Sequence, residues 1–179
     1  MSIRKALTRL GAGTAAVTVM LTLGLGTTPA SANVNDGYIS GAGTLFDDWG
    51  DEGTVSRYSH ASSNAACLWQ QVLWAEGYGH NFEIDGIFGP TTESRTKSLQ
   101  RRWGLADDGI VGKNTWSKAG ENLGYGQLVN DGPNRQYRMR YTGDSDDFVL
   151  YRGETGRHGF YELANENWRV AGYNSRTCT

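Results

Sequence analysis

Apolar positions recur at helical spacing between residues 65 and 123. Thr92, Thr96, Leu99 and Trp103 are four, three and four positions apart, so they share one helix face that Gly104 can end. An earlier stripe comprises Ala65, Leu68, Trp69, Val72 and Leu73, and a later, shorter stripe comprises Trp116, Ala119 and Leu123. The pattern predicts three short helices in an orthogonal bundle, with Trp69, Trp103 and Trp116 in its core.

The period changes from helical to alternating past Gly124. Four segments alternate apolar and polar side chains, and turn-forming residues separate them. These segments are 136–141, 148–152, 160–163 and 168–173. They predict a small antiparallel β meander of roughly 50 residues, which needs outside support to be stable. The fold class is therefore α+β.

One phrase occurs twice in the helical region, 23 residues apart. It reads Asp-Gly-Ile-Phe-Gly-Pro-Thr-Thr from Asp85 and Asp-Gly-Ile-Val-Gly-Lys-Asn-Thr from Asp108. Asp followed by Gly favours a tight turn, because the carboxylate accepts backbone N–H groups and Gly tolerates positive φ. We expect Ile87 and Ile110 to point inward as apolar anchors. The repeat predicts one structural unit used twice.

These residues resemble the bacterial peptidoglycan-binding domain family of three-helix cell-wall-binding modules with paired DGxxG turns. The resemblance covers residues 64–120, about a third of the chain. It rests on Trp69-Gln70, Leu73, Gly77-Tyr78, the Asp85 turn with Thr92, Leu99-Gln100, Gly104-Leu105, the Asp108 turn, Thr115 and Trp116. It implies that the protein binds peptidoglycan, through the stem peptide or the adjoining glycan, in a shallow groove next to the turns.

The resemblance also implies candidate ligand-binding residues. Those expected to line the groove are Tyr78, Phe88, Thr92, Arg95 and Val111, and those expected to shape the turns are Asp85, Gly86, Asp108 and Gly109. For Phe88 and Val111, a place in the core is the alternative. Arg95 and Thr96 stand where the family usually has a small and an aliphatic residue. Arg95 must then point outward or line a groove, because a charge cannot be buried unpaired.

The first 32 residues have the pattern of a secretory signal peptide. Arg4, Lys5 and Arg9 precede an apolar run from 15 to 25, and Ala30-Ser31-Ala32 is a small-residue cleavage signal. Removing 32 of the 179 residues leaves 147, and the net charge changes from −2 to −5. We expect a secreted, wall-associated protein without a membrane anchor after cleavage. An acidic chain without a basic cluster also argues against nucleic acid as a partner.

The two cysteines, Cys67 and Cys178, predict a disulfide in an exported protein. It would close a loop of 111 residues and tie the end of the β tail to the first helix. Before the helical module (63–124), residues 33–62 are acidic and rich in Gly, Ser and Asp. They are interpreted as a solvated leader or linker with a few docking residues.

The β tail, residues 125–179, has no recognised family and an unknown role. Arg138 and Arg140 alternate with Tyr137, Met139 and Tyr141, so one face of their strand is cationic and the other apolar. One interpretation is a solvated sheet face with cross-strand ion pairs. The other is a platform for anionic or sugar-containing wall fragments, with stacking on Tyr and Trp.

The sequence offers no candidate catalytic residues, metal ligands or cofactor site. His60, His80 and His158 are far apart in the chain and are expected to be exposed in polar loops. The acidic run at 144–147 lacks the spacing of a calcium loop. We therefore expect a non-catalytic wall-binding protein. The alternatives are a wall-targeted effector or inhibitor whose tail binds a protein partner, and a small cell-wall hydrolase.

Overall fold

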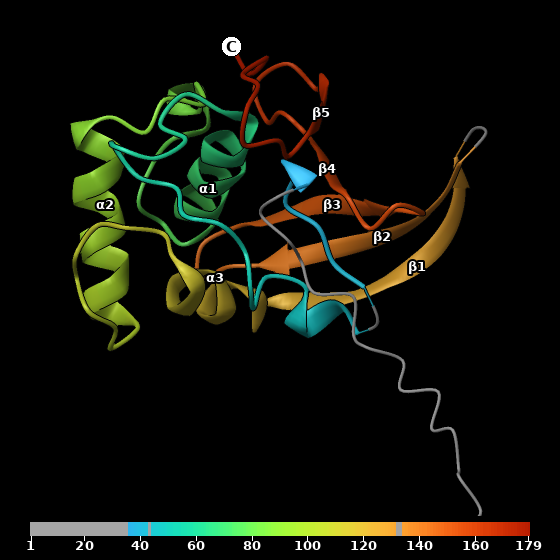
Figure 1. Cartoon of the computed structure of the whole chain (residues 1–179), viewed down its shortest axis with the longest axis horizontal. Helices are drawn as coiled ribbons and strands as arrows, with labels where there is room; N and C mark the ends of the chain where they lie inside the picture. Colours follow the sequence, from blue (N-terminus) through green and yellow to red (C-terminus); the bar gives the residue numbers. More distant parts are fainter. Residues whose placement is uncertain (1–35, 43, 132–133) are drawn as a thin grey trace, which may run out of the picture.

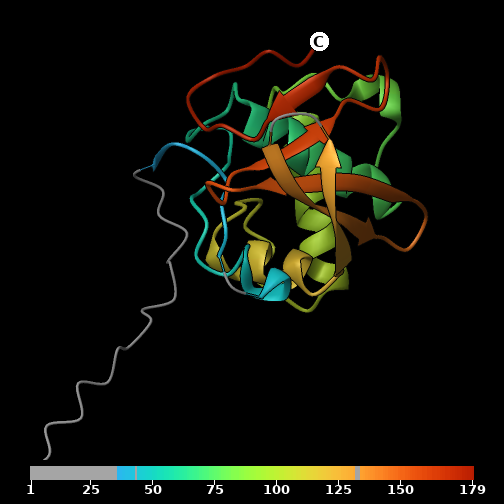
Figure 2. The same cartoon turned by 90° about the vertical axis from the view of Figure 1, so that its right-hand side faces the viewer.

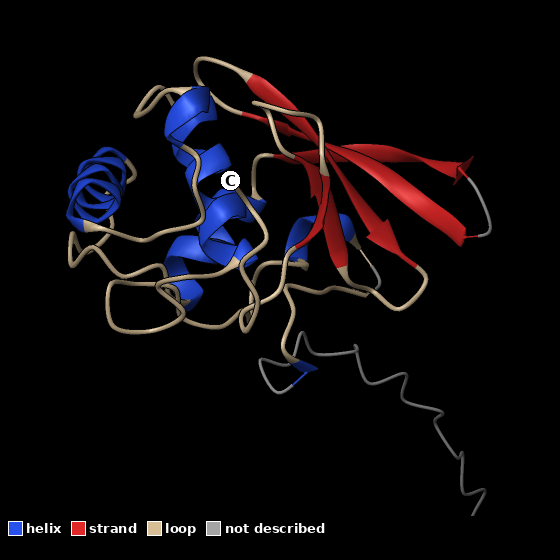
Figure 3. Cartoon of the chain, turned by 90° about the horizontal axis from the view of Figure 1, so that it is seen from above, coloured by secondary structure: helices blue, strands red, loops and turns tan. Residues whose placement is uncertain are grey.

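The computed structural model describes residues 36–42, 44–131 and 134–179. Three helices lie on one side and a five-stranded antiparallel sheet on the other (Figures 1 and 3). The helices are α1 (Asn64–Ala75), α2 (Pro90–Arg102) and α3 (Lys113–Gly120), with 3₁₀ turns η2 (Leu45–Asp47) and η3 (Asn81–Glu83). The strands are β1 (Leu123–Asp131), β2 (Asn134–Thr142), β3 (Asp147–Gly153), β4 (His158–Tyr161) and β5 (Trp168–Val170). The α+β prediction is confirmed, and the signal-peptide prediction lies outside the described residues.

Helix α1 is the centre of the packing. Ser63 caps it by accepting a hydrogen bond from the Ala66 N–H, and nearly every residue that follows is buried. Trp69 of α1 and Trp116 of α3 are fully buried and pack edge to face with ring centroids 5.3 Å apart. Trp103, at the end of α2, is only partly buried against this core. None of the helices in the described residues is long and apolar enough to cross a membrane.

The sheet is a simple meander in the order β1-β2-β3-β4-β5. The alternating pattern predicted the last four strands, and the structure adds β1. Strand β1 escaped prediction because glycines interrupt its pattern: its pairing with β2 is irregular between Gly124 and Gln127. At Gly126 a Cβ atom would lie 1.8 Å from the Arg138 carbonyl oxygen, so the close strand approach requires glycine there.

One face of the sheet packs on the helices. Its buried side chains come from three neighbouring strands and are Met139, Tyr141, Phe148, Leu150 and Phe160. The predicted disulfide between Cys67 and Cys178 is confirmed, and it fastens the C-terminal segment to α1. Figure 2 shows this segment, in red, running to the C-terminus at the top of the molecule. Asn64 adds to this attachment, because its amide donates to the Val170 carbonyl and its oxygen accepts from the Thr177 N–H.

Where the structure describes it, in residues 36–42 and 44–62, the segment before α1 packs on the rest of the chain more extensively than the expected linker with a few docking residues. Ile39, Trp49 and Val55 are fully buried in the common core. The Ile39 N–H donates to the Ala171 carbonyl, and Val55 exchanges both backbone hydrogen bonds with Val111. We call residues 44–62 the strap. Its apolar residues are buried singly by distant elements, so they leave no periodic pattern in the sequence.

A buried polar network joins the strap to the sheet and corrects the expectation for His158. This histidine is fully buried, and its Nδ1 lies 2.9 Å from Nε1 of Trp49. An indole nitrogen only donates, so Nδ1 accepts and the ring's Nε2–H donates to Asp48, 3.0 Å away. Asp48 also pairs with Arg152 at 2.7 Å. Each polar group of the network therefore has a partner, and the histidine has a structural role.

Candidate functional site

The two Asp-Gly phrases form turns of the same construction. The Asp85 carboxylate accepts the Ile87 N–H at 2.8 Å, and the Asp108 carboxylate accepts the Ile110 N–H at 2.8 Å. Gly86 and Gly109 both have positive φ, +71° and +75°, which explains why glycine follows each aspartate. The structural role predicted for these four residues agrees with their place in the turns.

A buried glutamine holds each turn from the preceding helix. Gln70 accepts from the N–H groups of Asp85 and Gly86 and donates to the Asp85 carboxylate and the Ile87 carbonyl. In the second turn Gln100 accepts from Gly109 and donates to the Asp108 carboxylate and the Ile110 carbonyl.

Each glutamine also donates to the threonine that ends its phrase, Thr92 or Thr115. Sequence reasoning gave these glutamines no role. The sequence did contain a signal for them: a glutamine follows a core residue in each of the two helices that precede an Asp-Gly turn, at Trp69-Gln70 and Leu99-Gln100.

The isoleucines of the two turns do not point inward, so that expectation is wrong. Ile87 and Ile110 are 44% and 41% exposed, whereas the residues that follow them, Phe88 and Val111, are 2% and 0% exposed. The reason is the strap, which runs beside both turns. Phe88 donates a backbone hydrogen bond to the Ala61 carbonyl, and Val111 pairs with the strap in the same way. Phe88 and Val111 thus lie in the core.

The first turn is covered by the C-terminal segment. The Arg176 guanidinium donates to the Asp85 carbonyl at 2.9 Å. A Cβ atom on Gly86 would lie 3.0 Å from the Ser63 carbonyl oxygen and 3.2 Å from Cβ of Cys178, which shows how closely the chain passes. The disulfide keeps this cover in place.

The second turn faces a shallow cavity of about 200 Å³. Its lining combines apolar and polar side chains from the end of α2, the α2–α3 connection and the start of α3: Gln100, Leu105, Ala106, Asp108, Ile110, Lys113, Asn114 and Thr115, with the backbone of Gly112. On its other side, the turn packs against α2, since a Cβ on Gly109 would lie 2.8 Å from side-chain atoms of Glu93 and Lys97. The exposed Ile110, Lys113 and Asn114 give this cavity an apolar contact, a cation and an amide.

The remaining candidates lie elsewhere. Arg95 pairs with Glu83 at 2.8 Å, and the hydrogen bond from Arg95 lowers the pKa of Glu83. Tyr78 lies a few residues before Glu83 in the chain. Its hydroxyl donates to the Ser98 carbonyl at 3.4 Å, and the Arg102 guanidinium lies over its ring. Glu93 and Lys97, which approach the second turn, lie on another side of α2 from Arg95, because residues two apart on a helix do not face each other.

Thr92 is buried and engaged by Gln70, and Thr96 accepts a hydrogen bond from the Trp69 indole at 2.9 Å. The structure therefore brings the predicted residues to three places. Asp108 and Gly109 lie at the open second turn, Asp85 and Gly86 at the covered first turn, and Tyr78 and Arg95 beside the loop before η3. Among the described residues, no three or more His, Cys, Asp or Glu side chains are grouped to hold a metal ion.

The part of the chain that contains both turns matches a known protein family. Residues 62–118 match the family model described as "Putative peptidoglycan binding domain". The resemblance predicted from the sequence is confirmed for this part of the chain. No solved structure matches the chain.

A curated relative is the zinc D-Ala-D-Ala carboxypeptidase of Streptomyces albus G. It is 38% identical over 94 residues, which is 51% of this chain. The match spans 33% of that protein, so this chain covers about a third of the relative's length.

Proposed function

We propose that this is a secreted, non-catalytic protein that binds peptidoglycan through the cavity at its second Asp-Gly turn. The family match over residues 62–118 is the observation that carries the proposal. Peptidoglycan is the partner that this match supports. The signal-peptide pattern of residues 1–32 supports export to the compartment where that polymer lies.

The geometry favours the second turn over the first as the binding site. Both turns have the same internal hydrogen bonds, but Arg176 and Cys178 lie across the first one. The second has an adjoining cavity whose exposed lining includes Ile110, Lys113 and Asn114, together with Ala106 and the Asp108 carboxylate, which is already engaged by the Ile110 N–H and by Gln100. An extended peptide with a carboxylate offers matching groups: side chains for Ile110, amides for Asn114 and a negative charge for Lys113. We therefore favour the stem peptide of the polymer as the ligand.

The repeat supplies a matched pair of variants to test this proposal. Ile110→Ser and Ile87→Ser remove equally exposed side chains from equivalent positions of the two turns. In co-sedimentation with purified peptidoglycan sacculi, we expect Ile110→Ser to weaken retention about fivefold, because roughly 1 kcal/mol of apolar contact is lost. Ile87→Ser should bind as the unaltered protein does. Equal retention of both variants would contradict the placement of the site.

The same mixtures test the non-catalytic part of the proposal. Turbidity of the sacculi and free D-alanine are followed for several hours, the second because the relative's name is that of a D-Ala-D-Ala carboxypeptidase. We expect both to stay constant. Falling turbidity or released D-alanine would show that the protein hydrolyses the wall polymer.

A further inference from the structure

The sheet has a second face that points away from the three helices (Figure 3). Strand register places Arg138, Tyr151, Gly159 and Val170 in one row across this face. Tyr161 and Trp168, which pair with each other, lie beside this row on the same face, because side chains two apart along a strand share a face. None of these residues belongs to the turns described above, so the face is a separate surface.

Three aromatic rings form a ridge on this face. Tyr151, Tyr161 and Trp168 contact one another edge to face, with ring centroids 5.1 to 5.9 Å apart. Tyr161 and Trp168 are 46% and 38% exposed. Gly159 lets the indole lie against the backbone, since a Cβ atom there would be 2.1 Å from the Trp168 ring. Mutual packing holds the rings in place while leaving much of their apolar surface in water.

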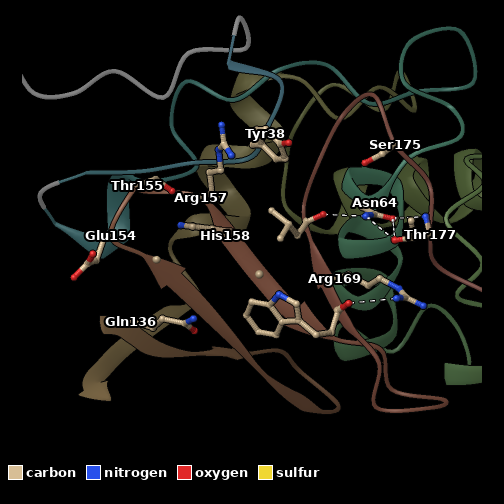
Figure 4. A pocket seen from close by; sticks show the side chains of 14 residues that line it. Tyr38, Asn64, Gln136, Glu154, Thr155, Arg157, His158, Arg169, Ser175 and Thr177 are labelled. Atoms are coloured by element: carbon tan, nitrogen blue, oxygen red, sulfur yellow. Dashed lines mark hydrogen bonds between the residues drawn. The ribbon is translucent and has the colours of Figure 1, made fainter. Parts of the chain in front are cut away.

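A hollow lies on each side of the ridge. Trp168 lines the larger one, of about 540 Å³, together with Gln136, Thr155 and Arg157 (Figure 4). Tyr161 lines the second, of about 470 Å³. Because the rings of Trp168 and Tyr161 touch, the two hollows are adjacent.

The charges around these hollows are nearly balanced. Arg140, in the second hollow, pairs with Asp147 at 2.8 Å, and Arg169, in the first, pairs with Glu162. The first hollow also has Arg157 and Glu154, and the second also has Glu166, so the two hollows together have three arginines and four carboxylates. Such a surface does not select a highly charged polymer.

We propose that this face binds an uncharged, hydroxyl-rich sugar chain, stacked on the ridge of Tyr151, Tyr161 and Trp168. Exposed aromatic rings bury the C–H faces of sugars, and the adjoining amide, hydroxyl and guanidinium groups bond their hydroxyls. An apolar protein surface fits less well, because it would leave Gln136, Thr155 and Arg157 desolvated without partners. The protein would then contact wall material at two surfaces, one for peptide and one for sugar.

The experiment titrates the full-length purified protein with soluble N-acetylglucosamine oligosaccharides, followed by calorimetry and tryptophan fluorescence. This probe contains no peptide, so its result is independent of the second-turn site. We expect the protein to bind the oligosaccharide. Trp168→Ala and Tyr161→Ala should each weaken this binding by about tenfold, because each variant loses one stacking contact and the apolar area that it buries. Tyr58→Ala is the matched control, because Tyr58 is 90% exposed and lies in the strap.

Two results would overturn the proposal: no binding of the oligosaccharide, or equal binding by the ridge variants and the Tyr58→Ala control. Circular dichroism verifies that each variant folds. Should Trp168→Ala fail that check, Tyr161→Ala decides the question alone, since the Tyr161 side chain is nearly half exposed. Saturable binding of a protein to this face without any response to the sugar would equally contradict the proposal.

Discussion

Replacing Gln100 by leucine should destabilise the protein markedly, although the side chain it removes is polar. Gln100 is buried and makes four hydrogen bonds, three of them to Asp108, Gly109 and Ile110 of the second turn and one to Thr115. Leucine fills a similar volume but can make none of these contacts. The Gly109 N–H would lose its partner beneath the turn, whereas the Ile110 carbonyl would keep the Gly112 N–H and the Thr115 hydroxyl.

The magnitude follows from those lost contacts. A hydrogen bond contributes about 1 kcal/mol net, and a buried group left without a partner costs about 1–3 kcal/mol. The buried Gly109 N–H is left unpaired, while the carboxylate of Asp108 is exposed and can be hydrated. We therefore expect Gln100→Leu to lower the free energy of unfolding by about 2–4 kcal/mol.

Urea unfolding with the disulfide intact measures this effect as a shift of the midpoint by about 1–2 M. The control is Gln127→Leu, the same exchange at an exposed position of β1, which should change the free energy by less than about 0.5 kcal/mol. Gln70→Leu should behave like Gln100→Leu. If Gln100→Leu matched the exposed control, the glutamine would not be holding the turn.

Three further predictions concern stability and binding. Burial, partly offset by the hydrogen bond from Tyr173, raises the pKa of Glu52 to about 7 from 4.5. Between these two pKa values the folded protein keeps a proton on Glu52 that the unfolded chain has lost. The free energy of unfolding, relative to that of the Glu52→Gln variant, should therefore fall by about 3 kcal/mol from pH 4 to pH 8. A difference between the two proteins that stays constant with pH would refute this. Cys178→Ser opens a loop of 111 residues and should cost about 4–5 kcal/mol in urea unfolding, whereas an unchanged midpoint would show that the bridge does not stabilise the fold. Arg95→Ala breaks a partly exposed pair with Glu83, so it should cost less than about 1 kcal/mol and leave retention on sacculi unchanged; a large loss of retention would place Arg95 in the site.

Local sequence patterns predicted the regular elements. Helical spacing identified α1, α2 and α3, and alternation identified four strands of the sheet. Both are signals between neighbours in the chain, as is the Asp-Gly chemistry of the turns. Strand β1 was missed because glycine at Gly124 and Gly126 removes the alternation that marks a strand.

Features that depend on distant contacts could not be predicted. Trp49 and His158 are 109 residues apart in the chain, and nothing in the sequence around either residue indicates that their side chains form a hydrogen bond. The difference between the two turns also has a distant cause. Their phrases are nearly identical, but Arg176, 91 residues after Asp85, covers only the first.

The most direct test of the central claim is nuclear magnetic resonance mapping of the peptide ligand. Amide shifts of the ¹⁵N-labelled protein would be recorded during titration with a soluble peptidoglycan fragment that carries the stem peptide. The account predicts saturable changes concentrated at residues 105–115, with Asp85 to Thr92 unaffected. Changes centred on the first turn, or none in either turn, would contradict it.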